Sequence, residues 1–244
     1  MRLRLPRQID KKQWLNRLGV KGEVDTQLLQ QLDRAERKLL EAASPQGIYR
    51  VCDLESSIIK GEESVTSSVL ELPGNAIKKH LAECNGMVVM AVTLGAAVDR
   101  LIRTAQIRDM AEAVLLDSGA SILAEQCADV LEESIHAENG DFTTGNCEAP
   151  GIGKAESTYY TGRYSPGYGD FPIEMQGQLI KAMDGPRTIG LSTNESYILI
   201  PRKSITAIIG TADHPVTGYL ATCDECQLGG KCALQQAGKP CWSK

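Results

Sequence analysis

The stretch RYSPGYGD, which begins at Arg163, gathers several chemically useful groups in one short loop. Arg163 offers a rigid fork of N–H donors that matches a carboxylate or a phosphate. Pro166 fixes one backbone angle, and Gly167 lets the backbone approach a ligand closely. The ring of Tyr168 can stack on a purine or face a cation. With Asp170 as an acceptor for an amine, these groups suit a small zwitterionic ligand that has a ring and a positive centre.

S-adenosylmethionine is a ligand of this kind, because it carries a carboxylate, an amine, a sulfonium and an adenine. The alternative is a structural turn, since glycine and proline beside an arginine also occur in plain turns. No GxGxxG string follows a strand in this sequence. The doubly wound methyltransferase fold is therefore not indicated.

A second group of reactive residues lies in the C-terminal stretch CDECQLGGKCALQQAGKPCW. Cys223 and Cys226 form a Cys-x-x-Cys step, and Cys232 and Cys241 follow after glycine-bearing spacers. In a cytoplasmic protein such a cluster predicts a metal site rather than a pair of disulfides. Four thiolates suit either a tetrahedral zinc ion or an iron–sulfur cluster, and the spacing does not choose between them. A tail without metal is the third alternative. The other cysteines include Cys52, Cys84 and Cys127, which are expected to be buried small hydrophobes.

The composition is that of an ordinary globular protein. The chain has 244 residues, of which 42% are hydrophobic and 23% charged, and its net charge is −5. No basic field marks a nucleic-acid-binding protein, and the basic N-terminal stretches MRLRLPR and DKKQWLNR are expected to be solvated. No apolar run approaches the roughly 20 residues of a membrane span, and the N-terminus lacks a secretory signal. We expect a cytoplasmic protein that binds neither nucleic acid nor membrane.

Hydrophobic periodicity predicts helices and strands that could position these residues. Helices are expected at 25–43, 75–83, 96–104, 110–136 and 172–184, with Asp25 as the N-cap of the first. Strands are expected at 47–54, 86–95, 187–192, 196–201 and 204–210. The last three strands are separated by so few residues that neighbours must be antiparallel. In the long helix, Gly119 allows another element to approach closely, and Asp117 requires a partner. The fold class is therefore α+β, with helices packed on a largely antiparallel twisted sheet.

Two motifs resemble a known family. The string from Arg163 to Tyr168 is similar to the Arg-x-x-x-Gly-Tyr signature of the reactivation domain of cobalamin-dependent methionine synthase. The downstream stretch 191–210, LSTNESYILIPRKSITAIIG, resembles a Thr-Glu-Ser…Pro…Ser-x-Ser segment of that domain. The DHP step at 213–215 falls where the family has His-Pro. The resemblance covers roughly residues 85–220.

The resemblance implies an S-adenosylmethionine site. In that family the domain donates the methyl group of S-adenosylmethionine to reduced cobalamin, so that a stalled cob(II)alamin returns as methylcobalamin. Arg163 would bind the carboxylate of the ligand. The backbone around Ser165 and Gly167 would contact its amino-acid part and adenine. Tyr168 would lie near the transferring methyl group, facing the corrin, and is the residue closest to a catalytic one.

The resemblance also implies the domain organisation and the partners. We expect an N-terminal helical segment at 1–45, an activation-domain-like α+β core at 46–220, and a cysteine-rich tail at 221–244. The sequence lacks the family's cobalamin-binding Asp-x-His-x-x-Gly string. We therefore expect a standalone, methyltransferase-associated reactivation protein for methionine biosynthesis. Its partners would be a cobalamin-dependent methionine synthase without its own reactivation domain, and an electron donor. The alternative is an iron–sulfur electron-transfer or scaffold protein of a corrinoid methyltransfer pathway.

Overall fold

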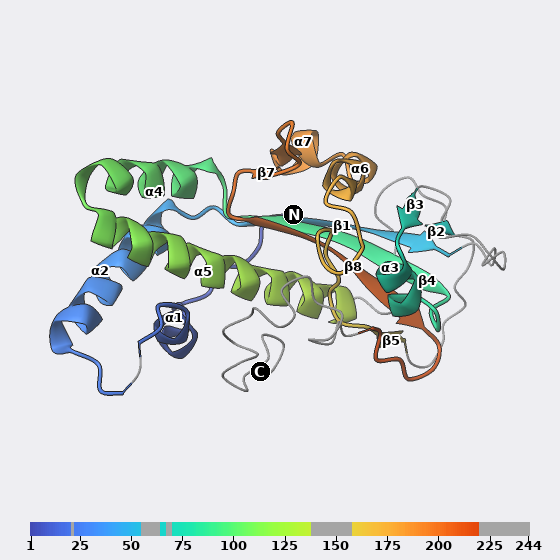
Figure 1. Cartoon of the computed structure of the whole chain (residues 1–244), viewed down its shortest axis with the longest axis horizontal. Coiled ribbons are helices and arrows are strands. Elements are labelled where there is room, and N and C mark those ends of the chain that lie inside the picture. Colours follow the sequence, from blue (N-terminus) through green and yellow to red (C-terminus); the bar gives the residue numbers. More distant parts are fainter. Residues whose placement is uncertain (21, 55–63, 67–69, 138–157, 220–244) are drawn as a thin grey trace. The chain divides into compact units, whose positions relative to one another are not determined.

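The computed structural model describes residues 1–20, 22–54, 64–66, 70–137 and 158–219 (Figure 1). The helices are α1 (Lys11–Arg17), α2 (Thr26–Ala42), α3 (Asn75–His80), α4 (Ala96–Arg108), α5 (Met110–Ala137), α6 (Met175–Ala182) and α7 (Gly185–Thr188). The strands are β1 (Gln46–Asp53), β2 (Ser64–Thr66), β3 (Glu71–Pro73), β4 (Gly86–Thr93), β5 (Tyr159–Tyr160), β6 (Ser192–Thr193), β7 (Leu199–Ile200) and β8 (Ser204–Ala212).

The largest sheet of the described residues has four strands in the order β1-β4-β8-β5. β4 runs antiparallel to β8, because Asn85 donates to the carbonyl of Thr211 at one end and Leu94 to that of Lys203 at the other, both at 3.0 Å. β5 is antiparallel to β8 as well. Every residue of β4 is buried, as its continuous apolar run predicts. The expected α+β fold with a largely antiparallel sheet is confirmed.

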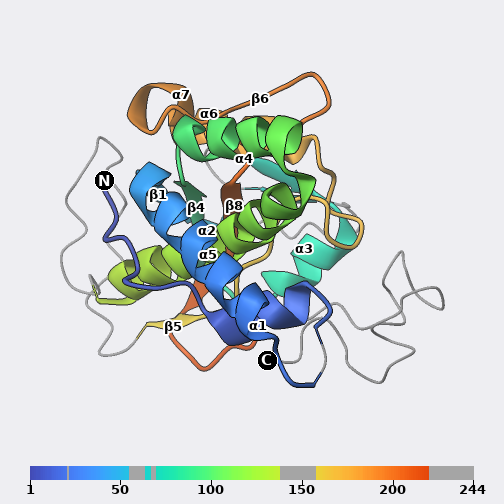
Figure 2. The same cartoon turned by 90° about the vertical axis from the view of Figure 1, so that its left-hand side faces the viewer.

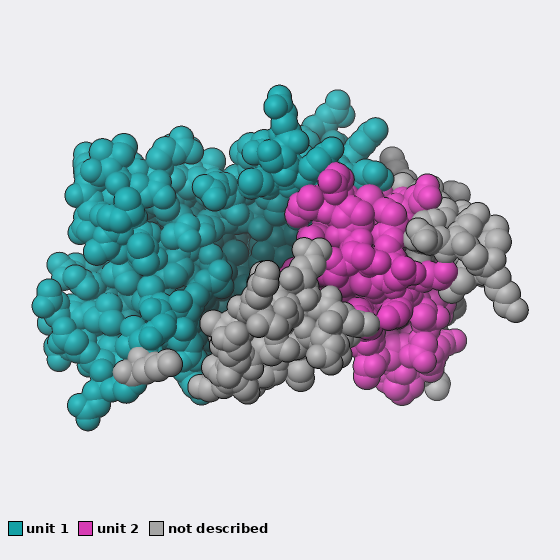
Figure 3. All heavy atoms as spheres, in the orientation of Figure 1, with its two compact units in different colours: residues 1–50, 89–147, 176–206 teal, residues 51–88, 148–175, 207–244 magenta. Residues whose placement is uncertain are grey.

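The chain divides into two compact units (Figure 3). Unit 1 comprises residues 1–50, 89–147 and 176–206, and unit 2 comprises residues 51–88, 148–175 and 207–244. Among the described elements, the chain passes from one unit to the other within β1, β4 and β8 and at the start of α6. The boundaries expected at residues 45 and 220 stay predictions.

In unit 1, helices α2, α4 and α5 lie against one another (Figures 1 and 2). Helix α2 buries Leu32, Ala35 and Leu39, the face that the periodicity indicates. Its N-cap is Asp25, as expected, with a side chain that accepts a hydrogen bond of 3.2 Å from the backbone N–H of Gln27. Helix α5 buries residues on most of its circumference, which makes it the central helix of the unit.

Trp14 of α1 packs directly on α5. Its ring is fully buried, and its Nε1 donates to the hydroxyl of Ser118 at 2.9 Å. A Cβ atom at Gly119 would lie only 2.3 Å from this ring, so the predicted close approach at Gly119 is confirmed. The expectation that DKKQWLNR is solvated is wrong for Trp14, because burying an indole outweighs the polarity of its neighbours. Asp117 does have a partner, since its carboxylate lies 2.9 Å from the ammonium group of Lys203, but its side chain is 58% exposed, so burial does not require that partner.

The strand expected at 187–192 is mostly absent. The chain forms the short helix α7 instead, with Pro186 in its first turn, where a missing N–H costs no hydrogen bond. The hydroxyl of Thr188 donates to the carbonyl of Asp184 at 2.7 Å and closes this turn. Only Ser192–Thr193 forms a strand, β6, which pairs with β7 in a separate two-stranded sheet.

Candidate functional site

Strand β5 ends at Tyr160, but the following segment, which carries Arg163, stays hydrogen-bonded to β8. The N–H of Thr161 donates to the carbonyl of Gly210 at 3.0 Å. Two residues past Gly162, Tyr164 exchanges two backbone hydrogen bonds of 2.8 Å with Ile208. Because both flanks of Arg163 are paired with β8, the backbone position of this arginine is fixed within unit 2.

The loop beyond Tyr164 is closed by its own backbone hydrogen bonds. The N–H of Tyr168 donates to the carbonyl of Ser165 at 3.3 Å, and the N–H of Gly167 to that of Phe171 at 2.8 Å. The N–H of Phe171 in turn donates to the carbonyl of Tyr168 at 3.0 Å. Gly167 has a φ of 92°, which side chains rarely tolerate. The loop is therefore an ordered turn whose conformation depends on glycine.

Gly169 is required by packing as well as by backbone conformation. Its φ is 55°, and a Cβ atom there would lie 2.9 Å from the hydroxyl of Tyr164 and 3.0 Å from the Cβ of Ala76. The hydroxyl of Tyr164 donates to the carbonyl of Tyr168 at 3.4 Å. The tight approach at Gly169 thus seats the tip of the loop on the Tyr164 ring and on helix α3.

The residues predicted to bind a ligand all lie in this loop, on its accessible side. Arg163 and Ser165 are half-buried, and Gly167 is exposed. The Nη1 atom of Arg163 is buried, so part of the guanidinium group is covered by protein. The side chain of Tyr168 is 62% exposed. Their individual roles toward a ligand stay predictions.

Tyr164 forms the base of the loop. It is only 6% exposed. Its ring centroid lies 4.9 Å from that of His80 and 6.3 Å from those of Tyr168 and Phe171. This aromatic cluster supports the loop from beneath and leaves Tyr168 at its outer edge.

Asp170 has a structural role that the sequence did not indicate. Its carboxylate accepts hydrogen bonds from the backbone N–H groups of Asn75 (2.7 Å) and Ala76 (2.8 Å), at the start of α3. Burial alone would raise the pKa of Asp170, but the N–H groups of Ala76 and Asn75 and the charge of Lys79 hold this pKa below its usual value. Gly74 leaves room for the carboxylate, since a Cβ there would lie 2.9 Å from the carbonyl oxygen of Asp170. The group expected to receive a ligand amine thus caps a helix.

His80, at the end of α3, is a buried titratable residue next to the loop that the sequence analysis did not single out. It is 3% exposed, and its Nε2 lies 3.1 Å from the carbonyl oxygen of Gly162, next to Arg163. Burial lowers the pKa of His80 to about 4, against a smaller opposing effect of the Gly162 bond. The helical spacing of Ala76, Ile77 and His80 is a signal that would have predicted its burial. No sequence signal links it to Gly162.

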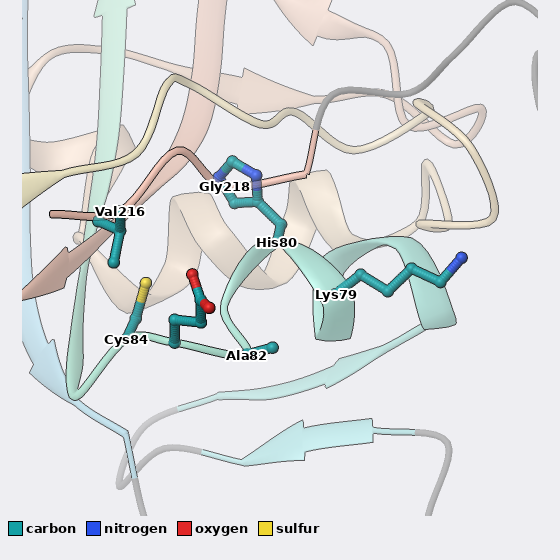
Figure 4. Close-up of a pocket in the computed structure, with 7 residues that line it drawn as sticks. Lys79, His80, Ala82, Cys84, Val216 and Gly218 are labelled. Atoms are coloured by element: carbon teal, nitrogen blue, oxygen red, sulfur yellow. The ribbon is translucent and has the colours of Figure 1, made fainter.

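A cavity of about 220 Å³ adjoins His80 (Figure 4). Its walls include Glu83, Cys84 and Val216. The thiol of Cys84 packs over Gly210, where a Cβ atom would lie 2.4 Å from the sulfur. Burial, with a contribution from the charge of Glu83, raises the pKa of Cys84 to about 11. Cys84 is thus a protonated packing thiol at neutral pH, in line with the expectation for the scattered cysteines.

The predicted metal ligands lie outside the described residues, which end at Tyr219. Within the described part of the chain, no cluster of three or more His, Cys, Asp or Glu side chains is arranged to hold a metal ion. The prediction of zinc or an iron–sulfur cluster at Cys223, Cys226, Cys232 and Cys241 therefore stays a prediction. Among the same described residues, no helix has both the length and the apolar character that crossing a membrane requires.

Comparisons with known proteins agree with this description. No curated protein matches the chain in sequence. Among solved structures, it is similar to the "MetH Reactivation Domain bound to AdoHcy", with a TM-score of 0.58 and 14% sequence identity. That alignment covers 95% of this chain and 82% of the other chain, and at this identity it establishes the fold. The profile of the "Vitamin B12 dependent methionine synthase, activation domain" matches residues 75–227, more than half of the chain. The chain therefore belongs to the family of vitamin B12 dependent methionine synthase activation domains.

Proposed function

We propose that this protein binds S-adenosylmethionine in the loop from Arg163 to Tyr168 and uses it to reactivate a cobalamin-dependent methionine synthase. The observation that carries the proposal is the loop itself. Its backbone is paired with β8 on both sides of Arg163, and its tip leaves Gly167 and Tyr168 accessible. Membership in the activation-domain family supports this ligand, as does the fold shared with a reactivation domain that was solved with AdoHcy.

The residues of the loop fit the parts of this ligand. The guanidinium group of Arg163 suits the carboxylate, because two parallel N–H donors can bind both oxygens. The backbone at Ser165, which is half-buried, and at Gly167, which is exposed, can approach the amino-acid part and the adenine, because Gly167 has no side chain to intervene. The ring of Tyr168 can face the sulfonium, since a positive centre is attracted to the face of an aromatic ring.

The chemistry requires positioning from the protein rather than a general base. Reduced cobalamin on the partner would be the methyl acceptor, once an external donor had supplied the electron that reduces cob(II)alamin. Arg163 and Tyr168 would hold S-adenosylmethionine with its methyl group accessible to that acceptor, and S-adenosylhomocysteine would be the product left in the loop.

The proposed partner is a cobalamin-dependent methionine synthase that lacks its own reactivation domain, together with an electron donor. Co-purification from the native cell tests this part of the proposal. A synthase recovered with the protein supports it. Recovery of a different corrinoid protein would favour the alternative function, an electron-transfer or scaffold role in another corrinoid pathway.

Calorimetric titration with S-adenosylmethionine and S-adenosylhomocysteine tests the ligand. We expect Arg163→Ala to weaken binding by on the order of 2–5 kcal/mol, because the carboxylate of the ligand loses its charged partner. Arg163→Lys should rescue binding poorly, since an ammonium lacks the planar fork. Arg187→Ala is the matched control, because Arg187 is an exposed arginine of α7 outside the loop. Unchanged affinity in a folded Arg163→Ala protein would overturn the assignment.

A further inference from the structure

The imidazole of His80 connects two backbone segments that are distant in the sequence. Its Nδ1 accepts a hydrogen bond of 3.1 Å from the N–H of Tyr219. Its Nε2 lies 3.1 Å from the carbonyl oxygen of Gly162. Because an acceptor needs a lone pair, Nδ1 is the unprotonated nitrogen, and Nε2–H donates to Gly162. Nδ1 also lies 3.3 Å from the carbonyl oxygen of Tyr219, which a proton on Nδ1 could reach. The two shorter contacts, of 3.1 Å each, are both satisfied only by a neutral ring protonated at Nε2, so we take the Nε2–H tautomer.

The hydroxyl of Thr161 completes this arrangement. It lies 2.9 Å from Nε2 of His80 and donates to the carbonyl of Gly162 at 3.1 Å. It also accepts a hydrogen bond of 2.7 Å from the N–H of Gly210, in β8. Thr161 is 3% exposed, so water does not compete for these bonds. The carbonyl of Gly162 thus receives two donors, one from the ring and one from the hydroxyl.

The ring has little room to move. Gly218 has a φ of 68° and lies against His80 (Figure 4). A Cβ atom there would be 2.7 Å from Cε1 of the imidazole and 2.8 Å from Cβ of Thr161. The centroid of the Tyr164 ring lies 4.9 Å from the centroid of the His80 ring. Residues on both sides of Arg163 therefore contact the same fixed imidazole.

We infer that His80 is a positioning residue for Arg163, an inference that rests on the proposed function. The peptide between Gly162 and Arg163 is oriented by the Nε2–H bond, and the direction of the Arg163 side chain follows from that peptide plane. A bidentate hydrogen bond from a guanidinium group to a carboxylate depends strongly on the direction in which the arginine side chain points. Losing the Nε2–H donor leaves Gly162 with a single buried donor and allows this peptide to rotate. Binding of the ligand carboxylate then weakens, although His80 itself is buried.

Two substitutions separate the two nitrogens of the ring. The amide of His80→Gln reaches the position of Nε2 and can still donate to Gly162. The amide of His80→Asn reaches only the position of Nδ1, so it can accept from Tyr219 but cannot donate to Gly162. We expect His80→Asn to weaken S-adenosylmethionine binding by about tenfold and His80→Gln by no more than about threefold. A purely structural role predicts equal losses in the two variants.

The comparison with Arg163→Ala separates this inference from the proposed function. If wild-type protein does not bind S-adenosylmethionine, the proposed function fails. If wild type binds, Arg163→Ala does not, and folded His80→Asn binds as tightly as His80→Gln, then only the positioning role is overturned. In addition, ¹⁵N NMR of wild type must report a neutral His80 protonated at Nε2, and a ring protonated at Nδ1 would also overturn it.

A second pair of variants covers the case in which His80→Asn does not fold. Thr161→Ser keeps the hydroxyl that donates to Gly162, whereas Thr161→Val removes it at nearly constant shape. We expect Thr161→Ser to bind S-adenosylmethionine within about threefold of wild type and Thr161→Val to bind about tenfold more weakly. Equal affinities in this pair would overturn the claim that the orientation of the Gly162–Arg163 peptide controls binding.

Discussion

Asp170 accepts a hydrogen bond of 2.7 Å at its Oδ2 from the backbone N–H of Asn75, the first residue of α3. This helix has Gly74 at its N-cap and therefore no capping side chain of its own. Asp170, in the loop that follows Arg163, supplies the missing cap, so helix α3 and this loop stabilise each other.

Asp170→Ala should destabilise the protein by about 1 kcal/mol, because two N–H groups at the start of α3 lose their acceptor. Urea unfolding measures this loss. Glu174→Ala is the control, since Glu174 is an exposed acidic residue close by in the sequence. Equal unfolding midpoints for the two variants would contradict the capping role.

Gly169→Ala should destabilise the loop more than Gly190→Ala does. Both glycines have positive φ, 55° and 64°, so both substitutions carry a similar backbone cost of about 1 kcal/mol. Only at Gly169 would the new Cβ also meet Tyr164 and Ala76, whereas nothing lies within 4 Å at Gly190. The difference in unfolding free energy between the variants measures the tight packing, and no difference would argue against it.

The stability of the protein should fall as the pH drops from 6.5 toward 4. The pKa of His80 is lowered from 6.5 to about 4 by burial, so in this window the unfolded chain binds a proton that the folded protein does not. The full contribution of neutral His80 to the free energy of unfolding is present above pH 6.5. Between pH 6.5 and about 4, that free energy falls by up to about 1.4 kcal/mol for each pH unit. Thermal unfolding of wild type and His80→Gln measures it. A wild-type curve parallel to that of the variant would contradict the prediction.

Tyr168→Phe should bind S-adenosylmethionine normally but slow the methylation of reduced cobalamin on the partner. The hydroxyl of this exposed residue makes no contribution to packing that a phenyl ring would lose. Binding is measured by calorimetry and methyl transfer by the absorbance of the corrin. A variant with normal rates of methyl transfer would show that the hydroxyl of Tyr168 has no part in the transfer.

The cysteine-rich tail is predicted to hold a metal. Anaerobic purification followed by iron, sulfide and zinc analysis distinguishes the alternatives. A brown protein with iron and sulfide supports a cluster, and a colourless protein with zinc supports a structural site. Reactive thiols at Cys223, Cys226, Cys232 and Cys241 without either metal would reject the site. Substituting Cys223 and Cys226 by serine should remove the metal, because half of the thiolate ligands are lost.

The sequence predicted those parts of the fold that have strong periodicity. The run at 86–95 has no polar alternation, and the structure buries all of β4. Helix α5 extends from Met110 to Ala137, within a residue of the expected end. The loop at Arg163 was also identified, because its residue types are unusual for a plain turn.

Contacts between distant segments were beyond the reach of the sequence pattern. His80 and Gly162 are 82 residues apart, and Asn75 and Asp170 are 95 residues apart, so no local spacing links either pair. The failure at 187–192 has a different cause. There the β propensity of a short segment predicted a strand, but Pro186 favours the first turn of a helix, and the chain forms α7 instead.

The place of β8 in the sheet has a consequence for how the protein is made. This strand lies between β4 and β5, yet among the strands of the described residues it is the last to leave the ribosome. Arg163 emerges well before Ile208, the residue that pairs with its neighbour Tyr164. During translation the segment that carries Arg163 therefore has no strand to pair with until Ser204–Ala212 has emerged. A nascent chain arrested before Ser204 should have no affinity for the ligand, even though every residue of the loop has already been synthesised.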